Sequence, residues 1–249
     1  MPAISETNPP SAPPLPLLSR VALVTGGSRG IGRAIALNLA SLGASVAICG
    51  RDLAALSETS DALSKIARPN FSQAADVTCP ADIATLVAKS EDALGPISLL
   101  VNNAGIGLFG PAHEKSDDDW DRVLNTNLKS VFLVSRAVIP SMIRAATGDI
   151  INISSLAGLN AFAGGGIYCA SKWGLQGLSA CMAEDLRGHG IRVSLVCPGS
   201  VATEFSSRGN KNASNALSAE DVAHAVAMIA TQGSQSFISQ VQLRPLRKA

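Results

Sequence analysis

Aromatic side chains are scarce in this sequence, since only six Phe, two Trp and one Tyr occur among its 249 residues. An excess of charge of either sign is also lacking, because the formal net charge at pH 7 is +1. Such a chain offers neither the basic field that attracts nucleic acid nor an acidic field for cationic partners. We therefore expect no nucleic-acid partner.

Cysteine and histidine are few, and neither shows the spacing of a metal site. The five cysteines are odd in number and include no C-x-x-C pair, and the three histidines are isolated from one another. This pattern argues against a disulfide framework and against a zinc site. It predicts reduced thiols in a cytoplasmic protein and no bound metal.

The first nineteen residues contain six prolines and almost no charge. The prolines interrupt every apolar run, and no basic stretch precedes them, which argues against a signal peptide or a membrane-spanning helix. We expect residues 1–19 to form a flexible, proline-rich tail without a membrane partner. Residues 20–249 are long enough for one sizeable core, and we expect them to form a single domain.

From Arg20 onward, short apolar runs alternate with longer segments of helical periodicity. The predicted strands are 21–25, 45–50, 71–77, 97–101, 150–154, 192–196 and 237–243. The predicted helices are 31–42, 53–67, 81–94, 118–146, 168–188 and 219–230. Near-continuous apolar runs are typical of parallel strands that are covered on both faces. The alternation predicts an α/β fold, a doubly wound, seven-stranded parallel sheet with helices on both faces.

A glycine-rich segment joins the first predicted strand to the first predicted helix. Residues 25–32 read T-G-G-S-R-G-I-G, with the glycines at 26, 30 and 32. Small residues let backbone N–H groups approach a pyrophosphate, and the start of the helix favours its negative charge. The place between strand and helix is the context that supports such a motif. A dinucleotide-binding loop is therefore predicted, with a purely structural turn as the alternative.

The end of the second predicted strand bears on which dinucleotide binds. A site for NAD(H) usually has an acidic residue there, which accepts from the ribose 2′-hydroxyl. This chain has Gly50 at that place and Arg51 next, with Arg29 expected nearby. Two guanidiniums suit a 2′-phosphate, and Asp52 is placed to cap the next helix. The pattern favours NADP(H) over NAD(H).

The only tyrosine, Tyr168, precedes Lys172 by four residues. On a helix these two positions share one face. A cation within about 4–6 Å lowers the pKa of a phenol from its usual value of roughly 10. Tyr168 is therefore a candidate general acid or base near neutral pH. The pair alone is also compatible with a core tyrosine beside a surface lysine.

Further short motifs accompany these segments in a characteristic order along the chain. They are Asp76-Val77, Asn102-Asn103-Ala104-Gly105, Asn127, Ser155 and Pro198-Gly199. Together with the glycine segment and the Tyr168/Lys172 pair, they make residues 20 to about 205 closely resemble the short-chain dehydrogenases/reductases. The resemblance implies a Rossmann-type catalytic domain and a nicotinamide cofactor.

The resemblance also implies a role for each member of a catalytic set. Tyr168 is expected to be the acid/base, and Lys172 to lower its pKa and bind the nicotinamide ribose. Ser155 is expected to polarise the substrate carbonyl, and Asn127 to hold a water of a proton relay. Ser154 is the competing serine, but alternation along a strand turns it away from Ser155.

The expected cofactor contacts come from every part of the chain that matches the family. They are Gly26, Ser28, Arg29, Gly30, Ile31, Gly32, Arg51, Asp76, Val77, Asn103, Ala104, Gly105, Tyr168, Lys172, Pro198, Gly199, Val201 and Thr203. A loop at about 200–217 is expected to cover the substrate. Residues 156–167, which include Phe162 and three consecutive glycines, predict an apolar wall of the pocket.

These inferences predict an NADPH-dependent carbonyl reductase, reversible as an alcohol dehydrogenase, that acts on a small ketone or aldehyde. Two alternatives are a 3-oxoacyl-[acyl-carrier-protein] reductase-like enzyme and a non-catalytic NADP(H)-binding sensor. The end of the chain lacks the glycine pair of many members related to fatty-acid synthesis, which argues against the first alternative. The complete catalytic set argues against the second, because a sensor needs no proton donor. The resemblance further implies a homotetramer or homodimer.

Overall fold

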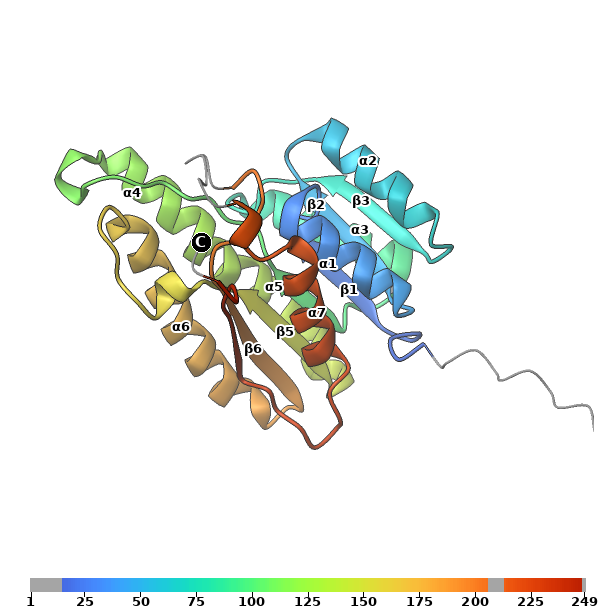
Figure 1. The fold of residues 1–249 in the computed structure, drawn as a ribbon. Coiled ribbons are helices and arrows are strands. Elements are labelled where there is room, and N and C mark those ends of the chain that lie inside the picture. Colours follow the sequence, from blue (N-terminus) through green and yellow to red (C-terminus); the bar gives the residue numbers. More distant parts are fainter. Residues whose placement is uncertain (1–14, 206–212, 248–249) are drawn as a thin grey trace, which may run out of the picture.

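The computed structural model describes residues 15–205 and 213–247 and shows seven strands within them. The strands are β1 (Val21–Thr25), β2 (Ser45–Gly50), β3 (Asn70–Ala74), β4 (Leu99–Asn102), β5 (Gly148–Ile153), β6 (Ile191–Pro198) and β7 (Gln240–Leu243). They pair in parallel in the order β3-β2-β1-β4-β5-β6-β7. The predicted doubly wound, seven-stranded parallel sheet is confirmed (Figure 1).

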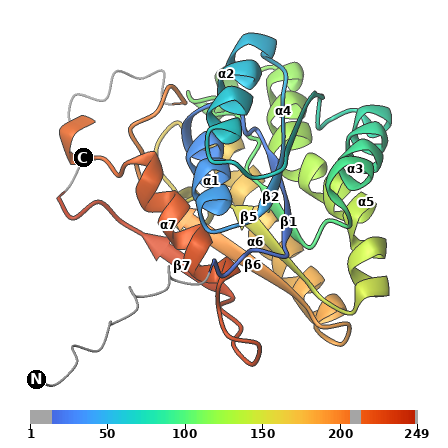
Figure 2. The ribbon, with the colours of Figure 1, turned by 90° about the vertical axis from the view of Figure 1, so that its right-hand side faces the viewer.

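Helices cover both faces of the sheet (Figure 2). They are α1 (Gly30–Ser41), α2 (Leu53–Ser64), α3 (Pro80–Leu94), α4 (Asp117–Leu124), α5 (Ser130–Ala145), α6 (Gly166–Arg187) and α7 (Ala219–Ala230). In β1, Ala22 and Val24 pack toward the layer of α1 and α7, whereas Val21 and Leu23 pack toward the layer of α3, α5 and α6. This two-sided burial explains why the central strands are mostly apolar, whereas the edge strands β3 and β7 carry polar residues.

One predicted helix is interrupted in the structure. The sequence predicts a single helix over 118–146, but α4 and α5 are joined by a π-helical turn, Asn125–Lys129. Such turns occur within helices and often at functional sites. Asn127 lies in this turn and is buried.

The predicted tail and substrate loop are only partly within the described residues. Residues 1–14 and 206–212 lie outside them. Residues 15–19 belong to the domain, because Leu17 is buried and its N–H donates to the carbonyl oxygen of Leu42 at 3.0 Å. The predicted boundary after residue 19 is therefore too late in the chain.

The described ranges 15–205 and 213–247 also bear on whether a membrane or a metal ion is a partner. No helix there is long and apolar enough to span a bilayer. No cluster of three or more His, Cys, Asp or Glu side chains there could hold a metal ion.

A charged cluster joins the four neighbouring strands β1, β4, β5 and β6 at the amino ends of the sheet, away from the site described below. The Asp149 carboxylate is almost fully buried in β5. It accepts from Arg20, just before β1, at 2.8 Å, and from Arg192 of β6 at 2.7 and 3.2 Å. Arg20 also donates to the carbonyl and hydroxyl oxygens of Ser98, just before β4. The cluster therefore fixes the strands to one another at this end.

We expect Asp149→Ala to lower the free energy of unfolding by about 3 kcal/mol, because it leaves two largely buried guanidiniums without their acceptor. Urea denaturation followed by circular dichroism measures the change. The control Glu184→Ala removes the exposed ion pair with Arg187 and should cost at most about 1 kcal/mol. Equal, small losses for the two variants would contradict a stabilising role of the cluster.

Candidate active site

A cleft of about 1490 Å³ lies at the carboxyl ends of the strands. It lies at the place where the strand order reverses between β1 and β4, which is where doubly wound sheets bind ligands. Every predicted site residue except Asn127 lines it. These residues are Gly26, Ser28, Arg29, Gly30, Ile31, Gly32, Arg51, Asp76, Val77, Asn103, Ala104, Gly105, Ser155, Tyr168, Lys172, Pro198, Gly199, Val201 and Thr203.

The glycine segment forms a tight turn that only glycine fits. Gly26 and Gly30 have φ angles of +63° and +53°, in the left-handed region that favours glycine. A Cβ atom at Gly32 would overlap the carbonyl oxygen of Gly26. Arg29 precedes α1 and makes no side-chain capping bond. The first-turn N–H groups therefore keep the arrangement that suits a pyrophosphate, and the turn fits a dinucleotide.

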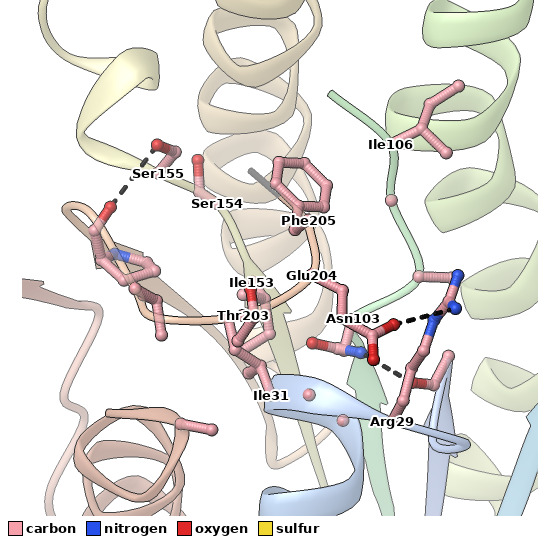
Figure 3. A pocket seen from close by; sticks show the side chains of 18 of the residues that line it. Arg29, Ile31, Asn103, Ile106, Ile153, Ser154, Ser155, Thr203, Glu204 and Phe205 are labelled. Atoms are coloured by element: carbon pink, nitrogen blue, oxygen red, sulfur yellow. Dashed lines mark hydrogen bonds and ion pairs between the residues drawn. The ribbon is translucent and has the colours of Figure 1, made fainter. Parts of the chain in front are cut away.

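The turn is braced from β4. The hydroxyl of Thr25 accepts from the N–H groups of Asn103 and Ala104 at 3.0 and 3.1 Å. The side-chain amide of Asn103 donates to the carbonyl oxygens of Thr25 and Gly26 at 3.0 and 3.1 Å (Figure 3 shows Asn103). The loops after β1 and β4 are thus held in one arrangement.

Tyr168, Lys172 and Ser155 meet at the other end of the cleft. Tyr168 and Lys172 lie in α6, and the Lys172 ammonium is 5.9 Å from the centroid of the Tyr168 ring. Lys172 Nζ donates to the carbonyl oxygen of Ile153 at 2.8 Å. Ser155 follows β5 and lies beside Tyr168, where it acts to lower the pKa of the phenol. The three groups offer a phenol, a hydroxyl and a cation around one region of the cleft.

The structure separates the two adjacent serines. Ser154 is buried, and its hydroxyl accepts from the side chain of Gln176 at 3.1 Å. Ser155 accepts from the N–H of Ala157 at 3.1 Å, and its hydroxyl also donates to the carbonyl oxygen of Pro198 at 3.4 Å (Figure 3). Ser155, the serine selected from the sequence, is the one close enough to Tyr168 to influence the pKa of the phenol.

Burial determines the protonation of Tyr168 and Lys172. It raises the pKa of Tyr168 to about 12, against a smaller opposing effect of the nearby Ser155. Burial also lowers the pKa of Lys172 to about 8, with a smaller opposing effect of Cys197. The expectation that Lys172 brings the pKa of Tyr168 down toward neutrality is wrong for the chain alone. Both side chains are enclosed, and loss of water disfavours a phenolate more than the chain's own groups stabilise it.

Asn127 is the one predicted catalytic residue that does not line the cleft. Its side-chain oxygen accepts from the N–H of Ile106 at 2.8 Å. Its side-chain nitrogen donates to the carbonyl oxygen of Ile106 at 2.9 Å and to the hydroxyl of Ser171 at 3.1 Å. Asn127 thus fixes the loop after β4, and the water relay expected of it stays a prediction.

The end of β2 has the features predicted for it. Asp52 caps α2 by accepting from the N–H groups of Ala54 and Ala55. A Cβ atom at Gly50 would lie 2.9 Å from the hydroxyl oxygen of Ser28, so this place has little room for a carboxylate. Arg51 lines the cleft close by.

Asp76 lies across this part of the cleft. It accepts from the N–H and hydroxyl of Thr78 at 2.9 and 2.7 Å. The bond from the Thr78 N–H, together with the bond from its hydroxyl and the nearby charge of Arg51, holds the pKa of Asp76 below its usual value. The carboxylate is therefore fixed and charged.

Sequence reasoning missed several residues of the cleft. Glu204, in the loop after β6, pairs with Arg29 at 3.1 Å across the cleft, and both side chains are exposed (Figure 3). Phe109 and Phe205 lie against the ring of Tyr168. No spacing in the sequence indicates these contacts. For the two phenylalanines, the one available signal is that the chain has only six residues of this type.

Comparisons with known proteins give consistent matches. The model of the short chain dehydrogenase family matches residues 20–243. A metagenomic short-chain oxidoreductase, solved in complex with NADP, is 45% identical and superimposes with a TM-score of 0.83, over 94% of this chain and 100% of that one. A short-chain type dehydrogenase/reductase of Picea abies is 36% identical over 242 residues, 89% of each chain. The 2-(S)-hydroxypropyl-CoM dehydrogenase 3 of Xanthobacter autotrophicus is 37% identical over 187 residues, 75% of this chain and 73% of that protein.

We expect the Lys172 amine of the cofactor-free protein to titrate at about pH 8, because burial destabilises its charged form. The ammonium should be present below that pH and the neutral amine above it. Carbon-13 NMR of lysine-labelled protein measures the titration. The resonance should vanish in Lys172→Met and persist in the control Lys89→Met, which changes an exposed residue of α3. Titration of Lys172 at its ordinary pH, above 10, would show that burial does not control it.

Proposed function

The chain belongs to the short-chain dehydrogenase/reductase family, and we propose that it is an NADPH-dependent carbonyl reductase that also oxidises the corresponding alcohol. The proposal rests on one observation. Tyr168, Ser155 and Lys172 meet in the same cleft as a glycine turn that fits a dinucleotide. The substrate is a ketone or aldehyde.

Tyr168 has the properties of the proton donor in the reductive direction. Bound NADPH would supply the hydride to the carbonyl carbon, and it would be oxidised in doing so. Negative charge then develops on the carbonyl oxygen, and a donor must neutralise it. With its pKa raised to about 12, Tyr168 keeps its proton at neutral pH and can deliver it to that oxygen. The hydroxyl of Ser155 provides a second hydrogen bond to the same oxygen.

Lys172 completes the proton path. Delivery of the phenolic proton leaves a phenolate, which a neighbouring cation stabilises. Below pH about 8, Lys172 is charged and can return a proton toward Tyr168. The same ammonium is placed to bind the ribose hydroxyls of the cofactor. We assign the water-mediated continuation of this path to Asn127.

Three features support NADP(H) over NAD(H). Gly50 leaves little room for the acidic residue that binds an unphosphorylated ribose. Arg29 and Arg51 line the same part of the cleft, and guanidiniums suit a 2′-phosphate. The metagenomic relative was solved with NADP. The 2′-phosphate would replace the Glu204 carboxylate as the partner of Arg29.

The homotetramer or homodimer and the cytoplasmic location stay predictions. Large apolar side chains are exposed on the helices that follow β4 and β5, which supports assembly through them. These side chains are Trp120 of α4, Phe132 of α5 and Trp173 of α6.

We expect Tyr168→Phe to lower kcat for ketone reduction about 10²- to 10⁴-fold, because it removes the proton donor and keeps the ring. NADPH consumption, followed by absorbance, measures the rate with an activated ketone. The dissociation constant for NADPH, measured by calorimetry, should change less than about threefold, which checks that the cleft is intact. Turnover close to that of the unmodified protein would refute the mechanism, whereas NADPH binding without any turnover in the unmodified protein would favour the sensor.

We expect Arg51→Ala to raise KM for NADPH about five- to tenfold and to change KM for NADH little, because only NADPH presents a 2′-phosphate to the guanidinium. Steady-state kinetics with each cofactor measure the effect. The control Arg144→Ala changes an exposed arginine of α5 outside the cleft. A preference of the unmodified protein for NADH would contradict the cofactor assignment.

A further inference from the structure

Four aromatic rings form a row at the substrate end of the cleft. Phe162 lies 6.0 Å from Phe109, Phe109 lies 5.4 Å from Tyr168 edge to face, and Tyr168 lies 6.0 Å from Phe205, each distance between ring centroids. The chain has six Phe and one Tyr, so half of its phenylalanines and its only tyrosine meet here. The three phenylalanines come from separate loops, after β4, before α6 and after β6, and Tyr168 comes from α6.

Glycines let the loops bring these rings together. A methyl group at Gly107 would lie 2.9 Å from the rings of both Phe109 and Phe205, and one at Gly165 would lie 2.6 Å from the ring of Phe162. The N–H of Gly110 donates to the carbonyl oxygen of Gly164 at 2.8 Å. The loops of Phe109 and Phe162 are therefore joined by their backbones.

The rings at the two ends of the row keep surface that a ligand can cover. Phe109 packs against the buried cluster of Ala157, Tyr168 and Cys169. Phe162 and Phe205 are 46% and 42% exposed, although both line the cleft. Burial of such a face against an apolar group is favourable, and paired aromatic rings gain more than their area alone provides.

One acidic side chain beside the row is directed away from it. The carboxylate of Glu204, beside Phe205 in the chain, pairs with Arg29 on the dinucleotide side of the cleft. Figure 3 shows the ring of Phe205 on the side of Ser154 and Ser155 and the Glu204 side chain reaching toward Arg29. The exposed faces of Phe162 and Phe205 are apolar, and they suit a flat apolar substituent.

We propose that Phe109, Phe162 and Phe205 form an aromatic clamp that binds the flat apolar substituent of the substrate, so that the preferred substrates are aryl ketones and aryl aldehydes. This inference rests on the proposed carbonyl reduction. A carbonyl oxygen that bonds with Tyr168 and Ser155 places the group next to the carbonyl against the row, because the Tyr168 ring is itself a member of it. The reaction is unchanged: the carbonyl carbon gains a hydride from NADPH, and the oxygen gains the proton of Tyr168.

The test compares acetophenone with cyclohexyl methyl ketone, which has similar bulk but is not flat. The measured quantity is the ratio of kcat/KM for the two ketones, with NADPH. The two ketones differ in intrinsic reactivity, but this difference is the same for every variant. It therefore drops out when the ratios of two variants are compared. Phe162 is the residue to change, because its ring lies at the end of the row, in contact with Phe109.

We expect Phe162→Ala to lower the ratio about tenfold, within the range that pocket contacts give. Phe162→Trp keeps an aromatic face and should restore most of the ratio. The control Phe237→Ala removes an exposed phenylalanine outside the cleft and should leave the ratio unchanged. A ratio that is the same in Phe162→Ala and in the unmodified protein would overturn the clamp.

Binding separates this inference from the proposed function. If no ketone or aldehyde leads to consumption of NADPH, the proposed function fails. Saturation-transfer NMR of acetophenone then tests the clamp by binding alone. Stronger transfer in the unmodified protein and in Phe237→Ala than in Phe162→Ala supports the clamp, and equal transfer in all three overturns it. Turnover of both ketones with an unchanged ratio overturns the clamp and leaves the reductase standing.

Discussion

The hydrogen bonds between the ends of β1 and β4 are the constraint on which the cleft depends. Thr25 accepts two N–H groups from the β4 loop, and Asn103 returns two bonds to the backbone of the glycine turn. The connections that follow β1 and β4 lead to opposite faces of the sheet, because the strand order reverses between these two strands. Without these bonds the two loops would be independent of each other. Nothing would then offset the conformational entropy that Gly26 and Gly30 lose when the turn becomes ordered. The dinucleotide turn and the loop that Asn127 holds are thus parts of one network.

The second controlling factor is the removal of water around α6 and β5. Burial acts on Tyr168 and Lys172 in opposite senses, since it keeps the phenol protonated and makes the ammonium easier to deprotonate. The pKa of the donor therefore stays far above neutrality while that of the lysine comes close to it. This division suits a site in which one group holds a proton in reserve and the other exchanges protons with its surroundings.

The sequence was sufficient for features that depend on local pattern. Strand and helix alternation, the glycine turn, the cap at Asp52 and the choice of Ser155 over Ser154 all follow from periodicity, spacing or short motifs. The features it could not provide depend on how distant loops meet. Glu204 is 175 residues from Arg29. Phe109 lies well before Tyr168 in the sequence and Phe205 well after it, yet both rings contact Tyr168. The predicted direction of the Tyr168 pKa shift is wrong for a related reason. The i, i+4 spacing indicates only that Lys172 is close, whereas the burial that raises the pKa is a property of the folded chain.

The π-helical turn between α4 and α5 has a consequence for how Asn127 is encoded. Val123, Asn127 and Val131 are all buried and are spaced by four residues. In a regular α-helix each residue advances the helix by about 100°, so two steps of four would rotate the inward face by about 80°. A wider turn takes up part of this rotation, and the amide can then point inward in line with the two valines. The position of Asn127 is therefore set by the number of residues in one turn as much as by its identity, and an insertion or deletion there would alter the site while every one of its side chains was preserved.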